Sequence, residues 1–369
     1  MEQEDLKYLI ALTLVPLVGS ITARKLISYS GSAKAVFSEK KSNLQKIPGI
    51  GSLLAGSIQP EKALVQAEHE LLFMERNRIN HLTVYDKEYP ERLKQCPDAP
   101  LVFYYKGKNG FSTEKVLSIV GTRNASEYGI EQCRKLIRDL TENNYKVLIV
   151  SGLAYGIDVQ AHMAALQYKQ ETVAVLAHGL HTIYPGAHKN LALRIIENGA
   201  ILSDFCTGDN PERNNFLKRN RIIAGLSDAT IVIESGKKGG ALITADLASS
   251  YNRDVFALPG RVSDPMSAGC NALIRDNKAA LVEGFEDIVF FLGWDANEKA
   301  NKPRQAELFA ELNEDEKKIA DELRKEERLS PDILSLRTGL PVSKISATLL
   351  GMEFRAIVRV MPGNCYRLV

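Results

Sequence analysis

Short apolar runs alternate with amphipathic stretches over the middle of the chain. The apolar runs cover 116–121, 146–152, 172–179, 199–205, 229–236, 254–260 and 279–284. Near-continuous apolar strands separated by helices are typical of a parallel sheet that is covered on both faces. We therefore predict an α/β fold with an extended Rossmann-like, doubly wound parallel sheet. A helix over 60–79 and a strand pair within 82–105 are expected to precede it.

The first 60 residues follow a different pattern, in which two short segments resemble each other. LVPLVGSITARKLI (14–27) and IPGIGSLLAGSI (47–58) each place a small turn, PLVG or PGIG, before an apolar helix. This repeat predicts paired helix–hairpin–helix motifs, in a helical, SAM-like module. In such motifs the glycine amides and the next helix N-terminus face a DNA phosphate. A helical packing module without DNA contact is the alternative.

The C-terminal part reads as a separate module. Residues 295–310 are polar and broken by proline, which indicates a linker. A helix, a helix–turn–helix and a Pro-Gly hairpin follow, which is a winged-helix layout. Its expected recognition helix, 342–353, carries only Lys344 as a base, so a protein-binding role is as plausible as DNA reading. The predicted division is a helical domain 1–65, a core 66–294, a linker 295–310 and a winged helix 311–369.

Composition narrows the class of protein. The 369 residues suit two or three domains, and a net charge of +2 means that any nucleic-acid site must be a local cationic patch. The N-terminus does not read as a signal peptide, and no apolar run reaches the ~18 residues of a membrane span. We expect a reducing, cytoplasmic setting because no two cysteines form a CxxC pair. The five are Cys96, Cys133, Cys206, Cys270 and Cys365.

Small and cationic residues follow several of the predicted strands. In an open parallel sheet, ligands bind outside the carboxyl ends of the strands. Glycine amides at helix N-termini there would favour phosphate, although each turn by itself could need glycine for packing alone. The residues are Gly121, Thr122 and Arg123; Ser151, Gly152 and Gly156; His181, Tyr184 and Pro185; and Lys237, Lys238, Gly239, Gly240 and Thr244.

The segment 210–229, NPERNNFLKRNRIIAGLSDA, gathers cations around one aromatic ring. Asn210 and Pro211 suit the start of a helix. Cations flanking a ring suit single-stranded nucleic acid, because cations neutralise phosphates and a ring stacks on a base. The alternative is a solvated helix face with the ring buried. The residues are Arg213, Lys218, Arg219 and Arg221 around Phe216.

Signals for catalysis or metal binding are weaker. Asp158 and His162 lie one helical turn apart and could form a general acid–base pair, but a hydrogen bond at the helix start is the favoured interpretation. His178, His181 and His188 fit no common zinc spacing. The chain has no GxxxxGK[ST] loop and no GxSxG elbow. We therefore expect no metal, no cofactor and no catalytic residue.

Taken together, these motifs resemble the DNA-processing protein A (DprA) family. The resemblance rests on SIVGTRNASEYG (118–129), SGLAYGIDVQAH (151–162), AHGLHTIYPGAHKNLA (177–192), NNFLKRNRIIAGLS (214–227), IESGKKGGALITADLA (233–248) and VFALPG (255–260). It implies a protein that is not an enzyme, binds and protects incoming single-stranded DNA, and loads the recombinase RecA during natural transformation. It also implies homodimers.

The resemblance assigns roles position by position. Arg123 corresponds to the arginine of the family's G-[ST]-R turn, which lines the DNA pocket. Phe216, Arg219, Asn220 and Arg221 correspond to its F-P-x-R-N-R-I-I segment, although Leu217 stands where the family has proline. Gly239, Gly240, Ala241 and Thr244 correspond to its SGSLITA-like stretch, with a glycine in place of the serine. Asn271, Leu273 and Ile274 fall where family members form their dimer.

Two other functions remain open at this point. The stretch GKKGGALITADLA (236–248) is comparable to the PGGxGTxxE motif of Rossmann-like phosphoribohydrolases, but it offers Asp246 where they have a catalytic glutamate. A duplex-DNA-binding regulator acting through the winged helix is the other candidate. The sparse charge of 342–353 weakens it.

Overall fold

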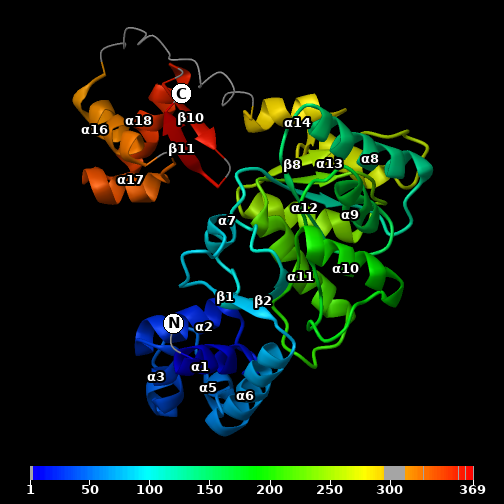
Figure 1. The fold of residues 1–369 in the computed structure, drawn as a ribbon. Coiled ribbons are helices and arrows are strands. Elements are labelled where there is room, and N and C mark those ends of the chain that lie inside the picture. The colour runs from blue at the N-terminus through cyan, green and yellow to red at the C-terminus, as the bar shows by residue number, and fades with distance from the viewer. Residues whose placement is uncertain (1–2, 295–311, 327, 356, 362, 369) are drawn as a thin grey trace.

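The structure, a computed structural model, describes residues 3–294, 312–326, 328–355, 357–361 and 363–368. Figure 1 shows a group of helices at the N-terminal end, a large sheet with helices around it, and a smaller C-terminal module. Every described helix is too short or too polar to cross a membrane. The predicted linker, 295–310, lies outside the described residues.

The N-terminal helices form two hairpins, as the repeat predicts. The first joins α1 (Gln3–Thr13) to α2 (Ser20–Ser30), and the second joins α4 (Lys41–Leu44) to α5 (Ser52–Ser57). Gly19 and Gly51 precede α2 and α5, and neither helix start has a side-chain cap. The remaining helices of this group are α3 (Ala33–Ser38) and α6 (Pro60–Arg76). Helix α6 runs through the predicted domain boundary at 65.

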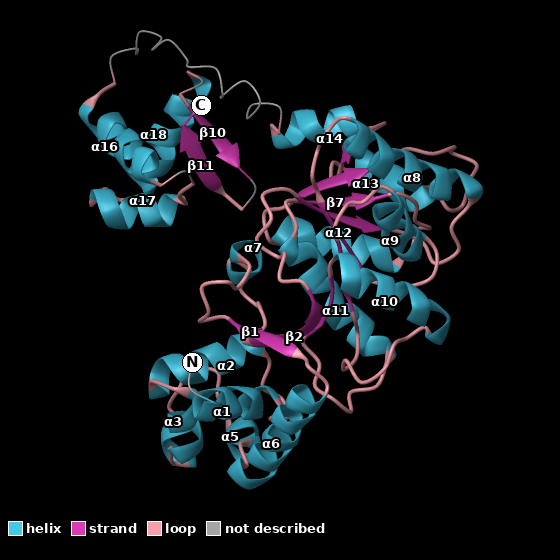
Figure 2. Cartoon of the chain, in the orientation of Figure 1, coloured by secondary structure: helices cyan, strands magenta, loops and turns pink. Residues whose placement is uncertain are grey.

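The predicted apolar runs are all strands of one nine-stranded sheet, in the order β1-β2-β6-β5-β4-β3-β7-β8-β9. The part from β6 to β9 is parallel, and β2 pairs antiparallel with both β6 and β1. Figure 2 shows β1 and β2 at the end of the sheet beside the N-terminal helices. The strands are β1 (Asn80–Thr83), β2 (Val102–Gly107), β3 (Val116–Val120), β4 (Leu148–Ser151), β5 (Thr172–Val175), β6 (Ala200–Ser203), β7 (Ala229–Val232), β8 (Asp254–Ala257) and β9 (Ala280–Leu281).

Helices cover both faces of the sheet, which explains why its central strands, β3 to β7, are buried at every position. One core cluster includes buried residues of α8 (Glu127–Glu142), α9 (Ile157–Gln167) and α14 (Phe285–Leu292). The other includes those of α10 (Lys189–Asn198), α11 (Arg213–Leu226), α12 (Gly240–Ser250) and α13 (Ala268–Arg275). The chain moves outward from β3 to β6 and then returns through α11 to β7. The sheet therefore has its switch point between β3 and β7, where doubly wound folds bind ligands.

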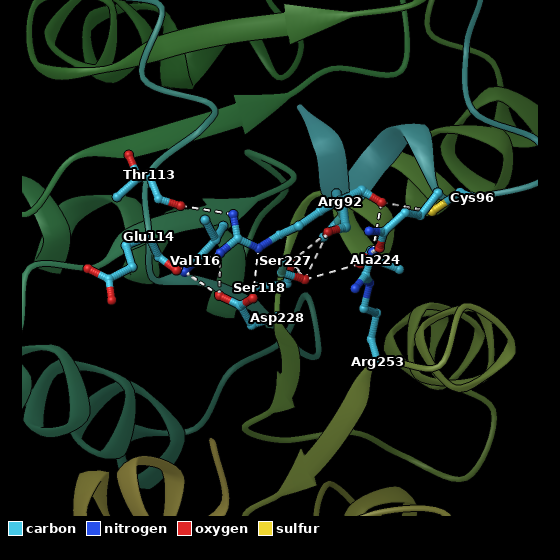
Figure 3. A network of polar contacts seen from close by, with 12 residues as sticks. Arg92, Cys96, Thr113, Glu114, Val116, Ser118, Ala224, Ser227, Asp228 and Arg253 are labelled. Carbon is cyan, nitrogen blue, oxygen red and sulfur yellow. Dashed lines mark hydrogen bonds and ion pairs between the residues drawn. The ribbon is translucent and has the colours of Figure 1, made fainter. Parts of the chain in front are cut away.

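At the amino ends of the strands, arginines serve the fold itself (Figure 3). Arg92, in the short helix α7 (Glu91–Lys94), donates to Asp228 over 2.7 and 3.0 Å. Asp228 also accepts a hydrogen bond of 2.9 Å from the backbone of Val116. Arg253 donates to the carbonyl of Arg92 over 2.7 Å. The guanidinium groups at this edge are thus engaged in internal contacts.

The C-terminal module has the predicted winged-helix layout. Helices α16 (Glu314–Lys325), α17 (Pro331–Thr338) and α18 (Val342–Phe354) precede the hairpin of β10 (Val358–Met361) and β11 (Cys365–Leu368). Leu329 adds a bridge to Tyr366, beside that hairpin. Gly363 donates a 3.0 Å hydrogen bond to the carbonyl of Asn252, which lies just before β8. The module therefore meets the core at the amino edge of the sheet.

Candidate nucleic-acid interface

The turns that follow β3, β4 and β7 are locked together at the carboxyl edge. The amide of Thr122 donates to the carbonyl of Glu234 over 2.7 Å, and the amide of Ile157 donates to the carbonyl of Thr122 over 3.1 Å. Gly156 has φ 77, and a Cβ there would lie 2.1 Å from the Thr122 carbonyl oxygen. Only glycine permits this approach. The backbone of the G-T-R turn is therefore held from both sides.

Helix α11 begins later than the sequence indicated. Its first residue is Arg213, with Glu212 before it, so Asn210 and Pro211 belong to the preceding loop. That loop is fixed by other contacts: Gly179 donates to the Asp209 carbonyl over 3.0 Å, and Thr207 donates to Glu70 of α6 over 2.7 Å. Burial raises the pKa of this Glu70 carboxyl. The N-terminal helices thus help to place the start of α11.

Arg219 is buried, which corrects its assignment as a side chain that touches DNA. It is 3% exposed, and its Nη1 donates to the carbonyls of Gly152, over 2.7 Å, and of Val175. A Cβ at Gly152 would lie 2.5 Å from the guanidinium, so a side chain there would displace Arg219. Burial lowers the pKa of Arg219 to about 10, while Asp158 opposes the shift. Arg219 therefore links the carboxyl ends of β4 and β5 through hydrogen bonds that lie beneath the surface.

Above Arg219 lies the half-buried ring of Phe216. The Arg219 guanidinium is 5.9 Å from the ring centroid, and that of exposed Arg123 is 5.1 Å from it. Tyr184 meets the same ring edge-on, with centroids 5.9 Å apart. Cations within about 6 Å of an aromatic face are attracted by its quadrupole. The predicted arginine and aromatic therefore do come together, from two distant parts of the chain.

Arg221 points to a different place from the predicted site. It forms an ion pair with Asp204 and donates to the carbonyl of Asp98, and its side chain is 16% exposed. Its pKa is raised by Asp204 and Asp98, although burial opposes the shift. Asn220 accepts from Arg219 Nε over 3.2 Å. Of the R-N-R run, the two arginines are thus structural rather than free for a ligand.

Ser151 and Thr244 are also buried and correct the predicted list. The Ser151 hydroxyl donates to the carbonyl of Ile119 over 2.6 Å, and Thr244 is 2% exposed. Gly121 is half-buried, and a Cβ there would lie 2.4 Å from Ile157. Their side chains cannot reach a ligand at the surface. The sequence alone does not show whether a polar residue or a glycine at the end of a strand packs in the core or binds a ligand.

Gly152, beside Arg219, and Pro185 are buried, and the other predicted residues are at least partly accessible. Helices α11 and α12 begin without side-chain caps, so the amides of their first residues, Arg213 and Gly240, are available to an anion. Gly239 is half-buried before α12 and Gly240 is exposed. The cations at this edge form no ion pair with any described residue. They are Arg123, Arg213, Lys218, Lys237 and Lys238.

Sequence reasoning passed over two residues at the same edge. Arg261 is exposed in the loop after β8, and its only signal was its place directly after the apolar run VFALPG. Tyr155 is exposed in the turn after β4, inside the motif SGLAYG. Both belong to turns that the topology, rather than local sequence, brings to the site.

Asp158 and His162 do not pair with each other. Asp158 accepts backbone hydrogen bonds from Gly152 and Ala154, and burial raises its pKa. His162 Nδ1 contacts the Thr172 hydroxyl at 2.7 Å, and burial lowers the pKa of this histidine to about 3. The favoured interpretation, a hydrogen bond at the helix start, fits these contacts.

Two of the three histidines considered as metal ligands bind backbone instead. His178 contacts the carbonyl of Gly179 at 2.9 Å, and His188 contacts that of Leu153 at 2.8 Å. His181 is exposed. Over the described ranges, no three His, Cys, Asp or Glu residues are grouped so that they could hold a metal ion.

The predicted dimer residues lie on α13. Leu273 is buried within its own core, and Asn271 exchanges two hydrogen bonds with the backbone of Gly260, over 3.0 and 3.2 Å. Neither side chain is free to face a second copy. Ile274 is partly buried at the surface of this helix and remains a candidate.

Comparison with family models gives two matches. The model described as DNA recombination-mediator protein A covers residues 80–293. The model described as DprA winged helix domain covers residues 302–364. The first match includes every residue of the interface above, and together the two cover more than half of the chain.

Similar proteins and structures agree with this. Protein Smf of Escherichia coli is 35% identical over 317 residues, covering 84% of this chain and 82% of that protein. The X-ray structure of DprA from Streptococcus pneumoniae superposes with a TM-score of 0.66 at 33% identity, covering 77% of this chain and 96% of that one. A structure of DprA from Helicobacter pylori, described as giving insight into its single-stranded DNA binding mode, has a TM-score of 0.53 at 29% identity, covering 59% and 97%. This chain therefore belongs to the DNA recombination-mediator protein A (DprA) family of DNA-processing proteins.

Proposed function

We propose that this protein binds single-stranded DNA along the carboxyl edge of its sheet. The observation that carries the proposal is exposed Arg123, which has no ion pair with a described residue and is held 5.1 Å from the centre of the Phe216 ring. Arginine can bridge phosphate oxygens, and uncapped helix starts offer amides to the same phosphates. The relative from Helicobacter pylori is described as binding single-stranded DNA, which supports this choice of ligand.

In this proposal Arg123, Arg213, Lys218 and Lys237 contact phosphates, together with the backbone amide of Gly240 at the start of α12. Phe216 offers its ring to a base when the Arg123 guanidinium turns from the ring to a phosphate. Stacking of one base on an aromatic side chain contributes about 1–3 kcal/mol. Arg219 and Asn220 act from beneath, because they hold Phe216 and the ends of β4 and β5 in place.

We further propose that the bound strand is protected and handed to the recombinase RecA, in the cytoplasm, during recombination and natural transformation. The description of the matching family as recombination mediators supports this step. A homodimer with Ile274 at its contact is part of the proposal. The protein acts by binding and is not an enzyme.

The two alternatives find less support. Asp246, which would supply the acid of a phosphoribohydrolase-like enzyme, is exposed and paired with Lys278 over 3.0 Å. In the winged helix, Lys344 is paired with Asp315 over 2.6 Å, so the one base of α18 is already neutralised. A duplex-binding helix needs free cations for phosphates.

RecA loading is tested on single-stranded DNA that is already covered by a single-strand-binding protein. Purified protein should raise the rate at which RecA hydrolyses ATP on that DNA, and should slow digestion of naked DNA by a nuclease. The Arg123→Ala variant should do neither to the wild-type extent. Full nuclease protection with no effect on RecA would retain DNA binding and remove the loading step.

A further inference from the structure

Tyr184 stands in the loop after β5 with its ring at the surface. It is 46% exposed, and its backbone amide donates to Nε2 of His178 over 3.3 Å. Pro185, which follows it, is buried. The Tyr184 ring packs edge-on against Phe216, with an angle of 63° between the two ring planes. The side chain is therefore held beside the proposed DNA site rather than in the core.

The rings of Phe216 and Tyr184 differ in what covers them. Two guanidinium groups, those of Arg123 and Arg219, lie over Phe216. Among the described residues, no cation lies over the Tyr184 ring, and no group accepts a hydrogen bond from its hydroxyl. A base can thus reach Tyr184 without moving a cation first.

Tyr155 repeats this arrangement in the neighbouring turn. It follows β4, which pairs with β5, and it is 50% exposed. Its ring meets the buried His188 ring edge-on at 4.9 Å, and His188 is fixed by its 2.8 Å contact with the carbonyl of Leu153. Within the described part of the chain, its hydroxyl has no hydrogen-bond partner either. His188 belongs to the short turn that directly follows Tyr184 and Pro185, so the loops that carry the two tyrosines are in contact.

We propose that Tyr184 and Tyr155 are base-stacking positions for single-stranded DNA, next to the phosphate contacts around Arg123. This rests on the proposed function and adds the residues that receive the bases. Every base has a π-face, so stacking tolerates any sequence, and a tyrosine hydroxyl can stay in water while its ring is covered. Two exposed rings, each packed edge-on against another ring, suit this role.

The test compares two oligonucleotides of equal length in fluorescence anisotropy. One is oligo(dT), and the other has abasic sites in place of its central bases and therefore the same phosphates. Tyr184→Ala should weaken binding of oligo(dT) by about 5- to 150-fold, the equivalent of one stacked base. Its affinity for the abasic strand, and the slope of log K against log salt, should equal those of wild type. Tyr155→Ala should behave in the same way.

Matched variants control for the fold. Tyr184→Phe keeps the ring and should bind as wild type, whereas Tyr184→Leu keeps apolar bulk without an aromatic face and should bind as Tyr184→Ala does. Tyr29→Ala removes an exposed tyrosine at the far end of α2 and should change nothing. Urea unfolding of each variant checks that the core is intact.

Two contrary results are separable. If Arg123→Ala weakens binding but both tyrosine-to-alanine variants bind oligo(dT) as wild type does, the stacking inference is wrong and the proposed function stands. Tyr184→Leu binding as tightly as wild type would also overturn stacking at that position. If the wild-type protein binds neither strand at low salt, the proposed function itself fails.

Discussion

The guanidinium of Arg123 lies 5.1 Å from the centre of the Phe216 ring, and this contact joins the turn after β3 to helix α11. The two residues are 93 positions apart in the chain, as 216 minus 123 shows. They meet because α11 crosses from β6 back to β7, next to β3, and so begins at the carboxyl edge. An exposed arginine is thereby kept in one place while its charge remains unpaired.

Replacing Arg123 by alanine should weaken single-strand binding and also its dependence on salt. Loss of one phosphate contact lowers the slope of log K against log salt by about 0.7 for single strands. Arg134→Ala, which removes an exposed arginine from α8, is the matched control and should leave the slope unchanged. Equal slopes and affinities for wild type and Arg123→Ala would remove this residue from the site.

Phe216→Ala should reduce affinity by about 1–3 kcal/mol with little change in slope, because a ring rather than a charge is lost. Combined with Arg123→Ala, its effect should be less than additive, since the ring also positions the guanidinium. Titrations of the two single variants and the double variant measure this. A variant that no longer folds would show that Phe216 belongs to the core.

Arg219→Ala should act on stability first. It leaves the carbonyls of Gly152 and Val175 and the buried carboxyl of Asp158 without their cation. Removing one member of a buried charged group costs about 3–5 kcal/mol. Urea unfolding should show a large loss for Arg219→Ala and almost none for Lys218→Ala, the exposed neighbour. Equal unfolding curves would contradict a structural role.

Some parts of this site could be predicted from the sequence and others could not. The strands from β3 to β9 were predictable because each falls in a short, mostly apolar run that ends at small or turn residues. Arg123 and Phe216 were predictable because their residue types suit a phosphate and a base. Burial was not. Arg219 and Lys218 are adjacent and equally charged, yet one lies beneath the edge and one upon it.

The reason lies in helical geometry and topology. Adjacent residues on α11 point about 100° apart, so the direction of each depends on which face packs against the sheet. The segment's cationic residues do not form a simple polar stripe, and that face could not be predicted. The start of the same helix was misplaced because tertiary contacts of Thr207 and Asp209, absent from any local pattern, hold the loop before it.

Acidification should destabilise the protein partly through His162. Its pKa is lowered by burial from 6.5 to about 3, so between these values the unfolded chain binds a proton that the folded chain does not. Stability therefore falls as pH falls through this window, by about 1.4 kcal/mol per pH unit at most from this group. Unfolding of wild type and His162→Gln from pH 7 to 4 should converge toward low pH. Parallel curves would show that His162 does not contribute.

Ile274→Glu should give monomers in sedimentation velocity, because a charge in an apolar contact between copies is costly. Val65→Glu, at an exposed position of α6, is the control and should leave the dimer intact. Circular dichroism confirms that both variants fold. A persistent dimer in Ile274→Glu would place the contact elsewhere.

The central claim is that the carboxyl edge of the sheet binds single-stranded DNA. Fluorescence anisotropy with labelled single-stranded and duplex oligonucleotides of the same sequence, over a series of salt concentrations, tests it most directly. The account predicts tighter binding of the single strand at every salt concentration, with an affinity that falls steeply as salt rises. Equal or tighter binding of the duplex, or no binding at low salt, would contradict it.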